Sequence, residues 1–73
     1  MDRRATQRRK IRQYMLDHGS ITPFECAWYI RCLKLATRIS EMIADGELID
    51  SEWVEWTDED GNKSRCKRYW LVD

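Results

Sequence analysis

Hydrophobic positions near the start of the chain recur at the spacing of one helical face. Between residues 6 and 18, Ile11, Tyr14 and Met15 follow an i, i+3, i+4 pattern, and the arginines around them fall elsewhere on the helical turn. Gly19 follows directly and can take the left-handed conformation that ends a helix. The pattern therefore predicts a first helix over residues 6–18.

The four residues TPFE carry a start signal for a second helix. Thr22 can cap the first free amides, and Pro23 suits the first helical position because it has no N–H. Glu25 lies three residues after the cap and can reach back to it. We expect this helix to run to about Ile30, with Ala27 and Ile30 facing inward.

A third helix is predicted from near Lys34 to the stop at Gly46. Its apolar positions repeat at helical spacing and are Leu35, Ile39, Met42 and Ile43. The opposite, exposed face is expected to carry Lys34, Thr37, Arg38 and Glu41.

After Gly46 the period of the pattern changes from 3.6 to 2, as expected for strands. Residues 49–56 alternate, residues 58–62 have turn chemistry, and residues 66–72 are rich in aromatic and branched side chains. This third of the chain is predicted to be a β-hairpin. Ser20 and Ile21 are too few for a strand of their own but can add an edge to that sheet.

The order of these elements is that of a winged helix. Three helices, a short strand after the first and a C-terminal hairpin wing predict one α+β domain over residues 1–73, with a winged helix-turn-helix architecture. The second and third helices form the helix-turn-helix, in which the third enters the major groove of DNA with its early residues at the base edges.

The distribution of charge is uneven although the net charge is zero. Residues 1–12 hold six basic residues against Asp2, a balance of +5, and residues 1–5 are interpreted as a flexible basic arm. Residues 39–62 hold nine acids and no Lys or Arg. Either block alone can simply be a solvated face.

Four stretches resemble a known family. HGSITPFE (18–25), LKLATRISE (33–41), IDSEWVE (49–55) and RYWL (68–71) are similar to the small helix-turn-helix proteins common in bacteriophages and prophages. The resemblance covers roughly residues 7–72 and implies a winged helix-turn-helix fold and a DNA-binding role. The chain departs from the family at Arg31, where a turn Gly is typical, and at Trp28 and Tyr29, where small or polar residues are usual.

The candidate DNA contacts come from three regions. They are Lys34, Thr37, Arg38 and Glu41 on the third helix, Arg3, Arg4, Arg8, Arg9 and Arg12 at the N-terminus, and Lys63 and Arg65 on the returning strand. Arg38 can offer two donors to guanine or grip a phosphate; the alternative is an ion pair with Glu41 or with an acid of the wing. The wing tip, Asp58 to Asp60, would be repelled by phosphate.

Metal, cofactor, enzyme and membrane functions find little support. Cys26, Cys32 and Cys66 with His18 make four nominal ligands, but no C-x-x-C pair seeds a zinc site, and the thiols are expected to be reduced. We expect no cofactor, no catalysis and no membrane partner, and a cytoplasmic location in a bacterial host.

Two functions remain open. The first is sequence-specific binding of double-stranded DNA, as a phage or prophage transcriptional regulator or recombination accessory factor. A homodimer joined through Trp28, Tyr29 and Trp56 would suit two-fold DNA sites. The alternative is a protein-interaction module that inhibits a host protein, using the acidic wing and the exposed aromatics.

Overall fold

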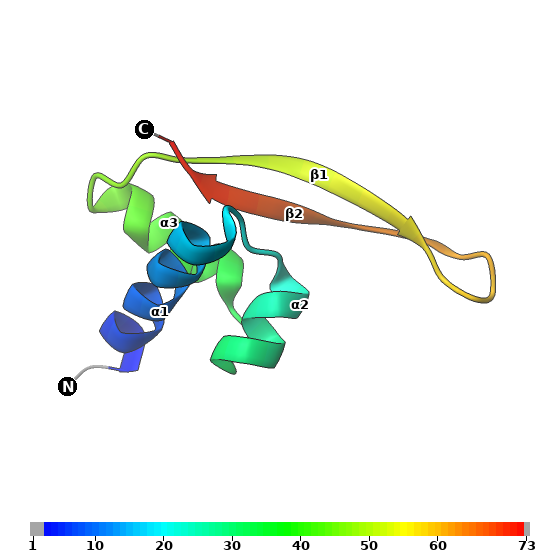
Figure 1. Ribbon diagram of the computed structural model, residues 1–73, viewed down its shortest axis with the longest axis horizontal. Coiled ribbons are helices and arrows are strands. Elements are labelled where there is room, and N and C mark those ends of the chain that lie inside the picture. The colour runs from blue at the N-terminus through cyan, green and yellow to red at the C-terminus, as the bar shows by residue number, and fades with distance from the viewer. Residues whose placement is uncertain (1–2, 73) are drawn as a thin grey trace.

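The computed structural model describes residues 3–72. In chain order its elements are α1 (Arg3–His18), α2 (Pro23–Glu25), the π-helix η1 (Cys26–Ile30), α3 (Leu35–Ala44), β1 (Ile49–Thr57) and β2 (Lys63–Leu71). Figure 1 shows the hairpin running across the helices and carrying its turn well beyond them. Three helical segments followed by an antiparallel hairpin confirm the predicted α+β winged helix-turn-helix fold.

Helix α1 starts earlier than the sequence pattern indicated. Its first turn contains Arg3 and Arg4, so residues 3–5 are helical rather than part of an arm, and residues 1–2 lie outside the described range. The helix buries Ile11 and Met15, as its apolar spacing predicted, and Gly19 follows it with φ +87°.

The start of the second helix is stabilised by the predicted capping box. The Glu25 N–H donates to Thr22 Oγ1 at 3.3 Å, and the Thr22 N–H donates back to Glu25 Oε1 at 3.0 Å. The Tyr14 hydroxyl donates to Glu25 Oε2 at 2.8 Å, so the same carboxylate also joins this turn to α1. After one α-turn the helix widens into η1, and both predicted inward residues, Ala27 and Ile30, are partly buried.

The turn that follows η1 is built on a left-handed arginine. Arg31 has φ 63° and ψ 34°, and its N–H donates to the Cys26 carbonyl. The chain therefore holds positive φ at the position where a glycine would adopt it without steric cost, and a non-glycine residue there costs about 1 kcal/mol. This turn sets the angle between η1 and α3.

Helix α3 buries a stripe that differs from the predicted one. The buried positions are Leu35, Arg38, Ile39 and Met42, an i, i+3, i+4, i+7 pattern, whereas Ile43 is 49% exposed. Arg38 occupies this stripe because it has a carboxylate partner, so its predicted exposed position was wrong. The core consists of Ile11, Met15, Ile21, Cys26, Cys32, Leu35, Ile39 and Met42.

The hairpin is anchored to the helices at its proximal end. Ile21 pairs with Tyr69 through N–H to carbonyl bonds of 2.8 and 2.9 Å, which confirms the predicted short edge strand. Further out, Phe24 meets Trp56 edge to face with ring centroids 5.1 Å apart. At the tip, Asp58 Oδ1 accepts the backbone N–H groups of Asp60 and Asn62 and so holds the turn.

All three cysteines are free thiols. Cys26 is fully buried, and desolvation, followed by the charge and the hydrogen bond of Cys32, raises the pKa of its thiol to about 12. No group of three or more His, Cys, Asp or Glu side chains within residues 3–72 is arranged to hold a metal ion. No helix of the same range is long and apolar enough to cross a membrane.

The raised pKa of Cys26 predicts a loss of stability at alkaline pH. The folded protein keeps the thiol proton up to about pH 12, whereas the unfolded chain releases it above about pH 8.5, so rising pH favours unfolding. We expect the free energy of unfolding to fall by about 1–2 kcal/mol between pH 8 and pH 10 in urea titrations with reductant. Cys26→Ala should flatten this dependence more than Cys66→Ala does. A flat wild-type profile would contradict the prediction.

Candidate nucleic-acid interface

The solvent face of α3 is short and uncharged, with apolar Ile43 and Ala44 exposed at its C-terminal end. Ala36, Thr37 and Ser40 are exposed along it, and Lys34 is exposed at its N-cap. Thr37 thus lies where the sequence pattern placed it. Ser40 was missed, although it follows Thr37 by three residues and helical spacing puts the two on one face.

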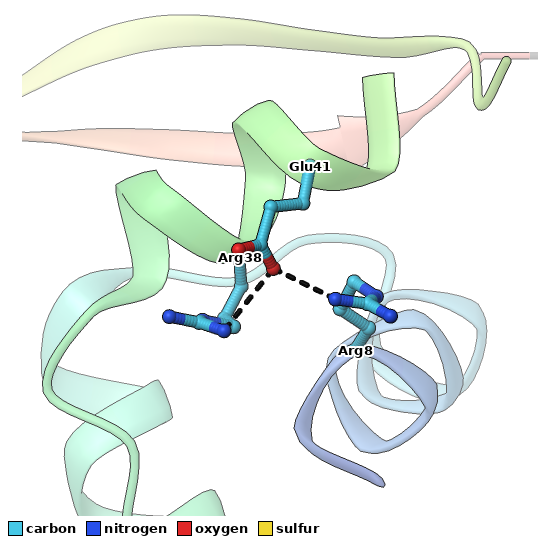
Figure 2. A network of polar contacts seen from close by, with 3 residues as sticks. All are labelled: Arg8, Arg38 and Glu41. Atoms are coloured by element: carbon cyan, nitrogen blue, oxygen red, sulfur yellow. Dashed lines mark hydrogen bonds and ion pairs between the residues drawn. The ribbon is translucent and has the colours of Figure 1, made fainter. Parts of the chain in front are cut away.

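Arg38 and Glu41 belong to an internal ion-pair cluster instead of that solvent face. Glu41 Oε1 accepts from Arg38 Nη1 at 3.1 Å and from Arg8 Nη1 of α1 at 2.8 Å. Figure 2 shows the carboxylate between the two guanidinium groups. The Arg38 side chain is only 7% exposed, and among the described residues its buried Nε has no hydrogen-bond partner. The alternative pairing of Arg38 with Glu41 is therefore the one observed.

A second arginine of α1, Arg12, forms an ion pair at the surface. Arg12 Nε donates to Glu47 Oε1 at 3.1 Å across the turn that follows α3, and Arg9 is exposed on α1. Together with Arg8, this pairing shows that two of the predicted phosphate-contacting arginines hold α1 against the end of α3.

A pocket of about 390 Å³ opens beside the N-terminus of α3. Five of its lining residues are cations, namely Arg3, Arg4, Arg31, Lys34 and Arg38, and none of the described lining residues is acidic. We call it the basic pocket. It brings together two N-terminal arginines and two α3 residues that the sequence analysis had assigned separately, and it adds Arg31.

A sequence profile described as a winged helix-turn-helix domain matches residues 6–73. The chain belongs to the winged helix-turn-helix domain family. No curated protein and no solved structure matched the chain. Membership of this family suggests DNA binding, and in a winged helix-turn-helix domain α2 with η1 forms the supporting helix and α3 the recognition helix.

The wing of this winged helix-turn-helix domain separates its charges by position. On β2, the Arg65 guanidinium lies 4.6 Å and Lys67 Nζ 5.3 Å from the ring centroid of Trp53, which is 57% exposed. Lys63 is exposed near the tip, beside the exposed acids Asp58 to Asp60. Arg68 pairs with Glu52 across the strands. The candidate wing contacts are thus Lys63 and Arg65, and they are not part of the basic pocket.

Proposed function

We propose that this winged helix-turn-helix domain binds double-stranded DNA in a sequence-specific manner, as a phage or prophage transcriptional regulator or recombination accessory factor in the cytoplasm of a bacterial host. The observation that carries the proposal is the acid-free solvent face of α3 beside a cluster of five cations. The hydroxyls of Thr37 and Ser40 on that face suit base edges, and the cations suit the phosphates that flank a groove.

Each part of the interface has a chemically distinct task in this proposal. The hydroxyls of Thr37 and Ser40 can donate to or accept from base edges, and the Ala36 methyl can contact a thymine methyl. Lys34, at the start of α3, supplies a positive charge near the phosphates at the edge of the DNA major groove. Glu41 and Arg38 act behind this face, because their pairing with Arg8 keeps α3 fixed against α1.

The wing supports the same orientation with weaker contacts. The Arg65 and Lys67 side chains lie against the Trp53 ring. This contact holds the side chains in place, and their charged ends remain near the surface. Lys63 is the wing cation nearest the acidic tip of the hairpin. Figure 1 shows that this tip lies far from the helices. Phosphate contact by the wing is therefore proposed for the middle of the hairpin and not for its tip.

A homodimer is part of the proposal, and exposed aromatics on η1 support it. Trp28 is 75% exposed and Tyr29 is 66% exposed, which is a large apolar area for a domain of this size. Trp56, the third predicted interface residue, is only partly exposed because it packs against Phe24.

The protein-interaction function remains the second candidate because of two surfaces that make no proposed contact with base edges. One is the acidic tip, and the other is the apolar surface of η1 and the following turn, where Leu33 is 89% exposed. A host protein with a basic surface would fit the first of these.

Neutralising the tip separates the two functions. In Glu59→Gln/Asp60→Asn the turn is kept, because Asp58 still accepts its two N–H groups. If the wing lies along DNA, loss of two negative charges should raise duplex affinity about two- to fivefold at low salt, with a smaller gain at high salt. Fluorescence anisotropy with a labelled duplex measures this. Asp17→Asn/Asp50→Asn is the matched control, and an unchanged affinity in the tip variant would favour the protein-interaction function.

A further inference from the structure

Cations dominate the lining of the basic pocket, and none of its described lining residues is acidic. Arg8 and Arg38 share a single carboxylate, and both guanidinium groups bond to the same oxygen, Glu41 Oε1. These three side chains carry a net charge of +1, and Arg38 is the one of them that lines the pocket, together with Arg3, Arg31 and Lys34. A hollow lined by charges of one sign attracts ions of the opposite sign, so an anion is favoured in this pocket.

Arg38 also carries an unsatisfied donor at this place. Its side chain is 93% buried, since 7% is exposed, and it lines the pocket while its Nη1 is committed to Glu41. Its Nε is buried and has no acceptor among residues 3–72. Buried donors are nearly always paired, so an unpaired Nε on a side chain that lines the pocket is a second feature that favours an acceptor there.

Arg31 reaches the pocket from a strained backbone position. It is the one non-glycine residue with positive φ within the described range, although the turn itself requires only a residue that tolerates φ 63°. Strain of this kind tends to persist where a side chain has a function. Here the side chain lines the basic pocket.

The N-terminus of α3 also favours an anion in the basic pocket. Lys34 is its N-cap and makes no side-chain cap hydrogen bond, so the first amides of a ten-residue helix are left without a side-chain acceptor beside the pocket. Free amides and the positive end of the helix dipole both favour an anion at this end.

We propose that the basic pocket is a binding site for a phosphate group. Arg38 holds the anion from the buried side, and Arg31 and Lys34 hold it from the exposed side. The inference rests on the proposed function, because it identifies the bound group as a backbone phosphate of DNA at the edge of the groove that α3 enters. A free phosphate ion has the same chemistry and is the other source.

Thermal unfolding of the intact chain in added inorganic phosphate, at constant ionic strength in chloride, tests the site without DNA. The melting temperature of the wild type should rise by several degrees and saturate, because phosphate binds only the folded pocket. Lys34→Gln and Arg31→Asn should raise the half-saturating phosphate concentration about tenfold or more. Lys10→Gln is the matched control on the exposed part of α1 and should behave as the wild type. Asn tolerates the left-handed conformation, so Arg31→Asn keeps the turn.

Equal shifts in all four proteins would overturn the proposal, since phosphate then acts only as a general stabilising salt. A second arm measures duplex affinity in the same buffers. Competition by phosphate in the wild type but not in Lys34→Gln supports the DNA backbone as the source, and unchanged duplex affinity supports a free phosphate ion. Failure of duplex binding itself would count against the proposed function and leave the thermal result standing.

Discussion

Replacing Glu41 by Ala is expected to lower the free energy of unfolding by about 2–3 kcal/mol. The change leaves Arg38 as a buried cation without a counter-ion, because its side chain is only 7% exposed and Glu41 is its only ion-pair partner among the described residues. The value lies below that of a fully buried pair because Glu41 itself is 30% exposed.

The matched control is Glu47→Ala, which removes the carboxylate from an exposed pair. Arg12 is 49% exposed there, so the loss should stay below about 1 kcal/mol. Urea unfolding followed by circular dichroism measures both variants, and the melting temperature of Glu41→Ala should fall by about 8–20 °C.

A second substitution shows whether the unpaired charge is the cause. Arg38→Met in the Glu41→Ala background removes the buried cation and fills much of its space with an apolar side chain, so stability should return by about 1 kcal/mol or more. Equal losses in Glu41→Ala and Glu47→Ala, or no recovery in the double variant, would show that the cluster does not hold α3 against α1.

Local signals in the sequence predicted the order of the helices and strands, but not the early start of α1 or the π-helical geometry of η1. The capping box of Thr22 and Glu25 spans three residues and forms as predicted, because each partner needs only its own turn. The hairpin follows from the alternation of residues 49–56 and from turn residues at its tip. Ile21 pairs with the sheet as expected, because its backbone N–H and carbonyl form hydrogen bonds with the backbone of Tyr69.

The positions of charged residues depended on long-range contacts and were harder to predict. The apolar spacing that includes Ile43 places Arg38 on the exposed side of α3. Arg38 is buried instead because it pairs with Glu41, whose carboxylate also bonds to Arg8, 33 residues away in the chain. The same applies to Arg12 and Glu47. Ion pairs between residues far apart in the chain produce no periodic pattern in the sequence.

The basic pocket is a further consequence of tertiary structure. Arg31 was notable in the sequence as a departure from a turn glycine, but only the fold places it beside Lys34 and the first turn of α1. Ser40, by contrast, could have been found from helical spacing alone.

The second large effect is expected on DNA affinity. Ser40→Glu places a carboxylate on the solvent face of α3, where it would meet the negative field of the groove, and duplex affinity should fall by about one to two orders of magnitude at low salt. The fold should be kept, because Ser40 is exposed and Glu is a good helix former. Gln13→Glu is the control with the same change of charge, on the exposed face of α1 where Gln13 bonds to Asp17.

The direct test is therefore the affinity of the wild type, Ser40→Glu and Gln13→Glu for one labelled duplex, measured by fluorescence anisotropy over a series of salt concentrations. We expect the wild type and Gln13→Glu to bind alike, with an affinity that falls steeply as salt rises, and Ser40→Glu to bind far more weakly at every concentration. Equal affinity of Ser40→Glu and Gln13→Glu, or no duplex binding by the wild type at low salt, would contradict the assignment of α3 as the DNA-contacting helix.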